Sequence, residues 1–140
     1  MHGVTRLGGA GATVAAGFAL LAVDPRLGLA ALLANVASHA VVQILKRLVA
    51  RPRPCDPDGH LLARIALPDP FSFPSGHAAA ATAVAATLTL WEPGLGFVLV
   101  PLAVGVAVSR VTLRVHHVSD VLAGAALGLA GAVGASRLLF

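Results

Sequence analysis

Apolar residues fill five long stretches of the chain, and charged residues mark the ends of each. No Asp, Glu, Lys or Arg occurs in 7–23, 27–45, 70–91, 93–109 or 121–136. A helix needs about 20 predominantly apolar residues to cross a membrane, and somewhat fewer where flanking side chains reach the interface. We therefore predict an all-α, membrane-embedded bundle that forms a single domain over 1–140. Its five transmembrane helices are expected at about 5–23, 27–48, 76–91, 94–112 and 119–138.

Turn residues separate these stretches. The segments "DPRLG" (24–28) and "EPGLG" (92–96) are typical of tight helical hairpins. The long connection, 51–74, holds six of the nine prolines and cannot span a membrane. Within it, "HLLARIAL" (60–67) has an amphipathic pattern, so we expect a short interfacial helix in a loop that caps one face of the bundle. A disordered polar linker is the alternative.

The composition supports a membrane protein. The chain is 57% hydrophobic and 11% charged, with a mean hydropathy of +0.86, whereas soluble domains are about 25% charged. The net charge of +4 therefore favours anionic lipid as a partner over nucleic acid.

Cys55 is the only cysteine, which excludes an intrachain disulfide. In helix 119–138, Gly124 and Gly128 form a G-x-x-x-G pattern that allows close helix packing.

Unusual polar residues gather at one face of the predicted bundle. If the helices alternate in direction, the end of the second, the start of the third, the end of the fourth and the start of the fifth share that face. The second helix adds a polar stripe at intervals of three or four residues, which should point toward a pocket: Asn35, Ser38 with His39, Gln43 and Lys46. For Asn35, Ser38 and Gln43, interhelical hydrogen bonds without function are at least as good an explanation. The residues at the shared face are Lys46, Arg51, Arg53, Ser75, Gly76, His77, Ser109, Arg110, Arg114, His116, His117 and Asp120.

This set of residues suits a phosphate monoester. Arg and Lys bind phosphoryl oxygens through charge-assisted hydrogen bonds. The turn "PSGH" (74–77) begins a helix, where free backbone N–H groups and the helix dipole favour an anion. Ser75 could donate its hydroxyl to the ligand, or it could be simply the N-cap of that helix.

His116 and Asp120 are four residues apart, so in a helix they would lie one turn apart on the same face. A carboxylate that binds one imidazole nitrogen leaves the other nitrogen free to act as a nucleophile. The alternatives are an interfacial histidine at 116 and an N-cap at Asp120. The pair indicates nucleophilic attack on phosphorus only in combination with the cations.

Three stretches together resemble the type 2 phosphatidic acid phosphatase superfamily, which is also similar to the vanadium haloperoxidases. The first is Lys46, the six residues "RLVARP" (47–52), then Arg53-Pro54. The second is "PSGH". The third is Ser109-Arg110, "VTLRV", His116, "HVS", Asp120. The stretches occur in order and cover residues 46–120.

The resemblance implies a metal-independent lipid phosphatase that needs no cofactor. It implies that His116 is the nucleophile that forms a phosphohistidine, that Asp120 orients His116, and that His77 protonates the leaving alkoxide. The implied phosphate-binding residues are Lys46, Arg53, Ser75, Gly76 and Arg110. Arg51 also precedes a proline, but it is two residues short of the spacing from Lys46. Family members commonly have six helices rather than five, and a Tyr-Pro pair often stands where this chain has His117-Val118.

Two other functions are compatible with the sequence. A metal-dependent hydrolase could use ligands from His116, Asp120, His77, His60, Asp56 and Asp58. A non-enzymatic transport or lipid-binding bundle could hold an anionic headgroup at the basic face. The sequence does not assign roles to His39, His117 and Arg114, or choose among oligomeric states.

Charge distribution and side-chain composition bear on the location and the substrate. Eight of the ten Lys and Arg residues are on the polar face, so the positive-inside rule places the site on the cytoplasmic side of a bacterial cell membrane. The candidate substrates are a polyprenyl phosphate or diphosphate, a polyprenyl-phosphoribose phosphate, phosphatidylglycerophosphate and phosphatidic acid. Aliphatic helices suit isoprenoid and acyl chains equally.

Overall fold

A computed structural model describes residues 3, 6, 8–67 and 69–140. Its helices are α2 (Ala10–Val23), α3 (Pro25–Val49), α4 (Gly76–Trp91), α5 (Gly96–Thr112) and α6 (Val118–Leu139), and a 3-10 turn, η1 (Pro93–Leu95), precedes α5. For the residues that the structure describes, the all-α prediction and its five helices are confirmed. The first predicted helix, 5–23, corresponds to α2, but positions 5 and 7 lie outside the described residues.

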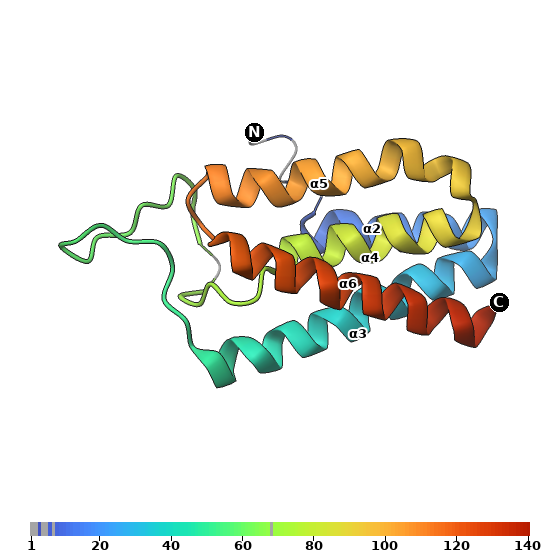
Figure 1. Ribbon diagram of the computed structural model, residues 1–140. Helices are drawn as coiled ribbons and strands as arrows, with labels where there is room; N and C mark the ends of the chain where they lie inside the picture. The colour runs from blue at the N-terminus through green and yellow to red at the C-terminus, as the bar shows by residue number, and fades with distance from the viewer. Residues whose placement is uncertain (1–2, 4–5, 7, 68) are drawn as a thin grey trace.

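Helix α4 is the centre of the bundle and packs against α2, α3, α5 and α6. The end of α3, the start of α4, the end of α5 and the start of α6 lie at one end of the bundle, beside the long loop (Figure 1). The C-terminus lies at the opposite end. The alternation of helix directions therefore brings the polar segments to one end of the molecule.

Local sequence explains where the helices begin. At the start of α3, the Asp24 carboxylate accepts hydrogen bonds from the N–H groups of Arg26 and Leu27 at 2.8 and 2.9 Å, and Pro25 occupies the first helical position. Glu92 accepts in the same way from the N–H of Gly94 at the η1 turn. Both tight hairpins are therefore present, as the sequence predicts.

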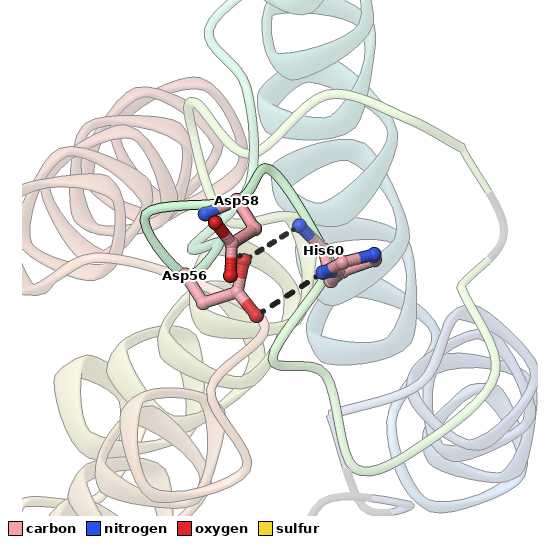
Figure 2. A group of neighbouring side chains, drawn as sticks. All are labelled: Asp56, Asp58 and His60. Atoms are coloured by element: carbon pink, nitrogen blue, oxygen red, sulfur yellow. Dashed lines mark hydrogen bonds and ion pairs between the residues drawn. The ribbon is translucent and has the colours of Figure 1, made fainter.

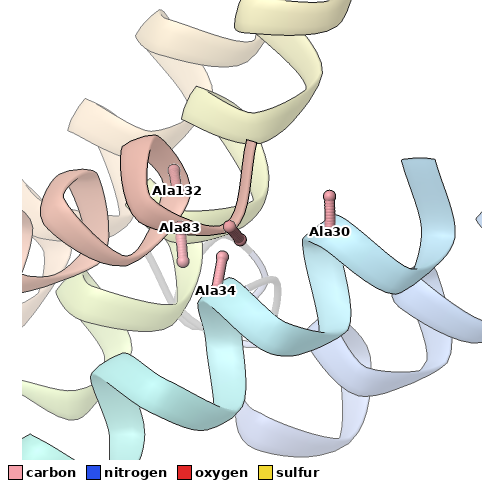
Figure 3. Packing of buried hydrophobic residues seen from close by; sticks show 5 residues of the cluster. Ala30, Ala34, Ala83 and Ala132 are labelled. Carbon is pink, nitrogen blue, oxygen red and sulfur yellow. The ribbon is translucent and has the colours of Figure 1, made fainter. Parts of the chain in front are cut away.

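Small residues make up the core between α3, α4 and α6. Ala30 and Ala34 of α3, Ala83 of α4, and Ala132 and Ala135 of α6 form one buried cluster (Figure 3). A Cβ atom added to Gly124 would overlap the carbonyl oxygen of Ser75, and one added to Gly128 would overlap that of Ala79. The G-x-x-x-G pattern thus marks the face on which α6 touches the backbone of α4, as predicted.

Three helical segments of the described residues are long and apolar enough to cross a membrane: Pro25–Val49, Pro93–Thr112 and Val118–Leu139. Their outward surfaces carry large apolar side chains, such as Phe97 at 89% exposure and Leu138 at 80%. Helices α2 and α4 have 14 and 16 residues, fewer than the span that the hydrocarbon core requires. The count of five membrane crossings therefore stays a prediction.

The expected interfacial helix at 60–67 is wrong. These residues are all described, and none of them is helical. Their backbone groups bond outside the segment: the N–H of Leu62 donates to the carbonyl of Pro54, and that of Arg64 donates to Leu113. Isolated antiparallel bridges pair Cys55 with Leu61 and Pro52 with Phe71. Hydrogen bonds to more distant partners thus replace the local pattern that a helix would need.

Candidate functional site

A cavity of about 300 Å³ opens at the polar end of the bundle. Its walls come from the start of α2 and the residues just before it, from α3, α4 and α5, and from the long loop and the short loop before α6. Of the predicted site residues, it gathers Lys46, Arg53, Gly76, His77, Arg110 and His116; the other residues lining it are Gly8, Ala10, His39, Gln43, Asp69 and Ala80. Residues more than 60 positions apart in the chain therefore share one small space.

Lys46 and Arg53 converge on the carboxylate of Asp69. The Lys46 Nζ lies 2.9 and 2.8 Å from the two carboxylate oxygens, and the Arg53 Nη2 lies 3.1 Å from Oδ1. Burial acts to raise the pKa of Asp69, but the hydrogen bonds and positive charge of Lys46, together with the charge of Arg53, outweigh this effect and lower the pKa. The structure thus holds an ionised carboxylate between two of the predicted phosphate-binding cations.

Arg53 also fixes the loop that carries His116. Its Nη1 donates to the carbonyl of Val115 at 2.9 Å, and its Nε donates to the carbonyl of Asp69 at 3.0 Å. The guanidinium is 1% exposed. Arg53 therefore ties the long loop to the short loop across the cavity, as the planar, multidentate guanidinium group allows.

At the start of α4, Gly76 and His77 line the cavity, whereas Ser75 does not. The Ser75 hydroxyl accepts a hydrogen bond from the N–H of Ala78 at 3.4 Å, and the side chain is fully buried. The Ser75 N–H donates to the carbonyl of Asp120 at 2.9 Å. Ser75 is thus the N-cap that the sequence offered as an alternative, and it joins α4 to the start of α6.

His116 lies just before α6 and faces Asp120 in the first turn of that helix. The His116 Nδ1 is 3.7 Å from Asp120 Oδ2, too far for a hydrogen bond, and it has no hydrogen-bond partner among the described residues. The Asp120 carboxylate accepts instead from the N–H of His117 at 2.8 Å and from Arg51 at 2.9 Å. The pair is close and buried, at 3% and 0% side-chain exposure.

The surroundings of His116 keep its imidazole neutral. Burial lowers the pKa of His116 to about 3, and the positive charges of Arg53 and Arg110 act in the same direction. A neutral imidazole retains the lone pair that a nucleophile needs, and the nearby cations are placed to hold an anion beside it.

The polar stripe of α3 divides into two parts. His39, Gln43 and Lys46 line the cavity, and the Gln43 Nε2 lies 3.1 Å from the His39 Nε2. Asn35 and Ser38 are buried away from it, and the Ser38 hydroxyl donates to the carbonyl of Asn35. The interhelical hydrogen bonds that the sequence offered as an alternative are not seen for these two side chains either, because the Ser38 bond lies within α3 and the buried Asn35 Nδ2 has no partner among the described residues.

Sequence reasoning missed Asp69. It is 23 residues from Lys46 and lies in a loop for which an interfacial helix was expected. The signal that could have revealed it is the position of this acidic residue, six before Ser75, in a loop that must return to a cluster of cations. His117 and Arg114 lie outside the cavity, as do Ser109 and Asp120.

The predicted metal ligands do not come together as one set. Asp56, Asp58 and His60 form a group in the long loop (Figure 2), and none of them lines the cavity that holds His77 and His116. The Asp56 Oδ1 accepts from the N–H groups of Asp58 and His60 at 3.1 and 2.8 Å, so this carboxylate shapes the turn. The His60 side chain is 79% exposed.

Residues 27–140 match the model of the PAP2 superfamily. The chain belongs to the PAP2 superfamily. The match covers α3 from Leu27 onward, all of α4, α5 and α6, and every residue of the three stretches that carry the resemblance, so the family expected from the sequence is confirmed.

Two solved PAP2-type structures resemble this PAP2 chain. The transmembrane phosphatidylglycerolphosphate phosphatase of Bacillus subtilis shares 29% identity at a TM-score of 0.79, and the match covers 98% of this chain and 73% of that one. LpxE of Aquifex aeolicus shares 25% identity at a TM-score of 0.85, with coverage of 97% and 82%. With these neighbours and its apolar helices, the protein is an integral membrane protein.

Curated relatives carry the name decaprenylphosphoryl-5-phosphoribose phosphatase. The Mycobacterium tuberculosis protein is 44% identical over 93 residues, which are 65% of this chain and 49% of the relative. The Mycolicibacterium smegmatis protein is 37% identical over 89 residues, or 62% and 46%. The matched region spans about half the length of these relatives.

Proposed function

We propose that this PAP2 protein hydrolyses a phosphomonoester or diphosphate of a membrane lipid through a phosphohistidine intermediate. The observation that supports it most is the cavity, in which Lys46, Arg53 and Arg110 surround a space beside the neutral imidazole of His116. Three cations suit the charge that develops on a transferring phosphoryl group. They would be poorly placed around a divalent metal ion.

The proposed reaction has two displacements. The Nε2 lone pair of His116 attacks phosphorus, the bond from phosphorus to the lipid oxygen breaks, and His77 donates a proton to the departing alkoxide. Water then attacks the phosphohistidine, His77 takes up a proton from that water, and inorganic phosphate leaves as the imidazole is restored. Asp120 orients His116, while Lys46, Arg53, Gly76 and Arg110 hold the phosphoryl oxygens. General acid assistance of this kind is typically worth about 10² to 10⁴ in rate.

The surroundings of the cavity favour a lipid substrate. A second, apolar cavity of about 190 Å³ is lined by α2, α4 and α5. Val84 and Val106 in its wall lie one helical turn from Ala80 and Arg110 in the wall of the polar cavity. An apolar chain attached to a phosphate held by Arg110 would therefore find apolar surface directly beside it.

Among the candidate substrates, a polyprenyl-phosphoribose phosphate is the one that we favour, because the curated relatives are named for such an activity. The test is phosphate release in the presence of a chelator, measured over the panel of candidate lipids. We expect wild type and His60→Ala to be active and His116→Ala to lose at least about a thousandfold, since it lacks the nucleophile.

The same assay separates the alternatives. Loss of activity with chelator and in His60→Ala would support a metal-dependent hydrolase. If wild type binds lipid phosphate but releases none, the protein is a binding or transport bundle. If a lipid other than the phosphoribose compound is cleaved fastest, the substrate proposal alone is overturned.

We also propose that the site faces the cytoplasm of a bacterial cell, on the basis of the excess of basic residues at the polar end. Cys55 is exposed in the long loop and is the only thiol, so it reports this orientation directly. A maleimide that cannot cross membranes should label Cys55 only after the cells are opened. Labelling of intact cells would place the site on the outer face.

A further inference from the structure

Arg51 contacts the proposed catalytic pair from outside the cavity. It follows the last turn of α3, where Ala50 has a left-handed backbone conformation, and its side chain reaches the start of α6. The Arg51 Nη1 lies 2.7 Å from the Ser119 hydroxyl and 2.9 Å from Asp120 Oδ1. Arg51 does not line the cavity, unlike Arg53 two residues later.

The backbone of Arg51 is also held in place. Its carbonyl accepts from the N–H of Ser72 at 2.9 Å, and the Ser72 hydroxyl donates to the carbonyl of Pro52 at 2.9 Å. Pro52 and Phe71 form an antiparallel bridge, which joins the beginning of the long loop to its end. Ser72 is fully buried. The backbone from which the Arg51 side chain extends is therefore held in place, although the side chain itself is 38% exposed.

These contacts determine how the Asp120 carboxylate is oriented. Arg51 binds Oδ1, and the N–H of His117 binds Oδ2 at 2.8 Å. With both oxygens held, the carboxylate cannot rotate without breaking a charge-assisted hydrogen bond. In this orientation Oδ2 faces the Nδ1 of His116 at 3.7 Å. A small shift of the imidazole toward Asp120 would then complete the hydrogen bond.

We propose that Arg51 is a positioning residue, which holds the Asp120 carboxylate in the orientation that presents Oδ2 to His116. This inference rests on the proposed phosphatase function. Arg51 makes the Nδ1–H tautomer of His116 the favoured one and leaves Nε2 free to attack phosphorus. Its effect passes entirely through Asp120, because its guanidinium lies outside the cavity in which phosphate would bind.

The role predicts a kinetic difference between two neighbouring arginines. Arg51→Met should lower kcat about 10- to 100-fold and leave KM within about twofold of wild type, since the substrate does not touch residue 51. Arg53→Met should raise KM, because Arg53 lines the cavity. Arg51→Lys keeps the charge and should restore part of kcat. Arg47→Met, at an exposed position of α3, is the matched control and should match wild type.

A double-mutant cycle distinguishes positioning through Asp120 from a separate role. The full chain is purified in detergent, and phosphate release from polyprenyl-phosphoribose phosphate is measured for Arg51→Met, Asp120→Asn and the double variant. We expect the double variant to be no slower than Asp120→Asn alone. The proposal would be overturned if the activity losses of the two single variants multiply in the double variant. A raised KM with unchanged kcat in Arg51→Met would also overturn it. Where Arg51→Met does not fold, Arg51→Lys and Ser119→Ala complete the same cycle.

The orientation of His116 can also be tested by spectroscopy, without measuring turnover. The ¹⁵N signals of the His116 side chain should show the Nδ1–H tautomer in wild type and a mixture of tautomers in Arg51→Met, with Arg47→Met unchanged. An unchanged tautomer would contradict the proposal. If wild type releases no phosphate, the phosphatase function fails, while the tautomer measurement still tests whether Arg51 positions the pair.

Discussion

The alanine cluster in the middle of the bundle and the cavity at its polar end are built from the same helices in opposite ways. In the cluster, Ala34, Ala83 and Ala132 let the backbones of α3, α4 and α6 come close together. At the polar end, long charged side chains such as Lys46 and Arg53 reach across the space between the segments. The core is therefore sensitive to added volume, whereas the site is sensitive to lost charge.

The largest expected effect tests the core. Gly128→Leu should prevent folding, because its side chain would push into the backbone of α4 at Ala79 and Ala83. Gly134→Leu in the same helix is the matched control, since nothing lies within 4 Å of its Cβ position. Detergent-solubilised yield and the thermal unfolding temperature measure both variants. Equal stability of the two would show that α4 and α6 do not pack at Gly128.

The second effect tests the site. Lys46→Met keeps the length of the side chain but removes its charge, and we expect phosphate release to fall about 10²- to 10³-fold, as for loss of one preorganised donor. The adjacent residue, Arg47, is exposed, so Arg47→Met is the matched control. The unfolding temperature should change little in either. An active Lys46→Met enzyme would remove Lys46 from the proposed phosphate site.

The apolar pattern was sufficient to predict the helices. Each of the five uncharged stretches corresponds to one α-helix of the described part of the chain, because burial in lipid or in the core requires apolar side chains on a backbone whose hydrogen bonds are satisfied internally. The grouping of helix ends followed from alternation alone. These features depend on residues that are close in the chain, which is why they are visible without the structure.

The sequence pattern did not predict the structure where hydrogen-bond partners lie far apart in the chain. The amphipathic segment 60–67 is not helical, and the N–H of Arg64 bonds instead to the carbonyl of Leu113, which comes from another loop. Asp69 reaches Lys46 and Arg53 only after the long loop folds back. Motif spacing distinguished Arg53 from Arg51 as the residue at the cavity, but it gave no sign that Arg51 contacts Asp120. Side-chain contacts of this kind depend on how the loops close.

The third effect concerns the neutral histidine of the site. The pKa of His116 is about 3 in the folded protein and about 6.5 in the unfolded chain, so the unfolded chain binds a proton first as pH falls. Stability should therefore be complete above pH 6.5 and should decrease below it, by about 2 kcal/mol at pH 5. Thermal unfolding between pH 7.5 and pH 5 measures this. His116→Gln should show a smaller loss, and an equal loss would assign it to other groups.

The smallest expected effect concerns the carboxylate of Asp69, an anionic side chain that lines the cavity. Asp69→Asn removes the charge that Lys46 and Arg53 now neutralise, so inorganic phosphate should inhibit the enzyme about three- to tenfold more strongly. Asp56→Asn, which changes a carboxylate outside the cavity, is the matched control and should leave inhibition unchanged. Weaker inhibition in Asp69→Asn would mean that this carboxylate orients the two cations for phosphate instead of competing with it.

The glycine and alanine contacts among α3, α4 and α6 also limit how the protein can move. Helices that meet through glycine and alanine have no long side chains between them to rearrange, so these three behave as a rigid frame. Helix α5 packs chiefly against α4, and α2 against α3. Any widening that admits a bulky lipid must therefore come from these two outer helices, which stand on either side of the apolar cavity beside the site.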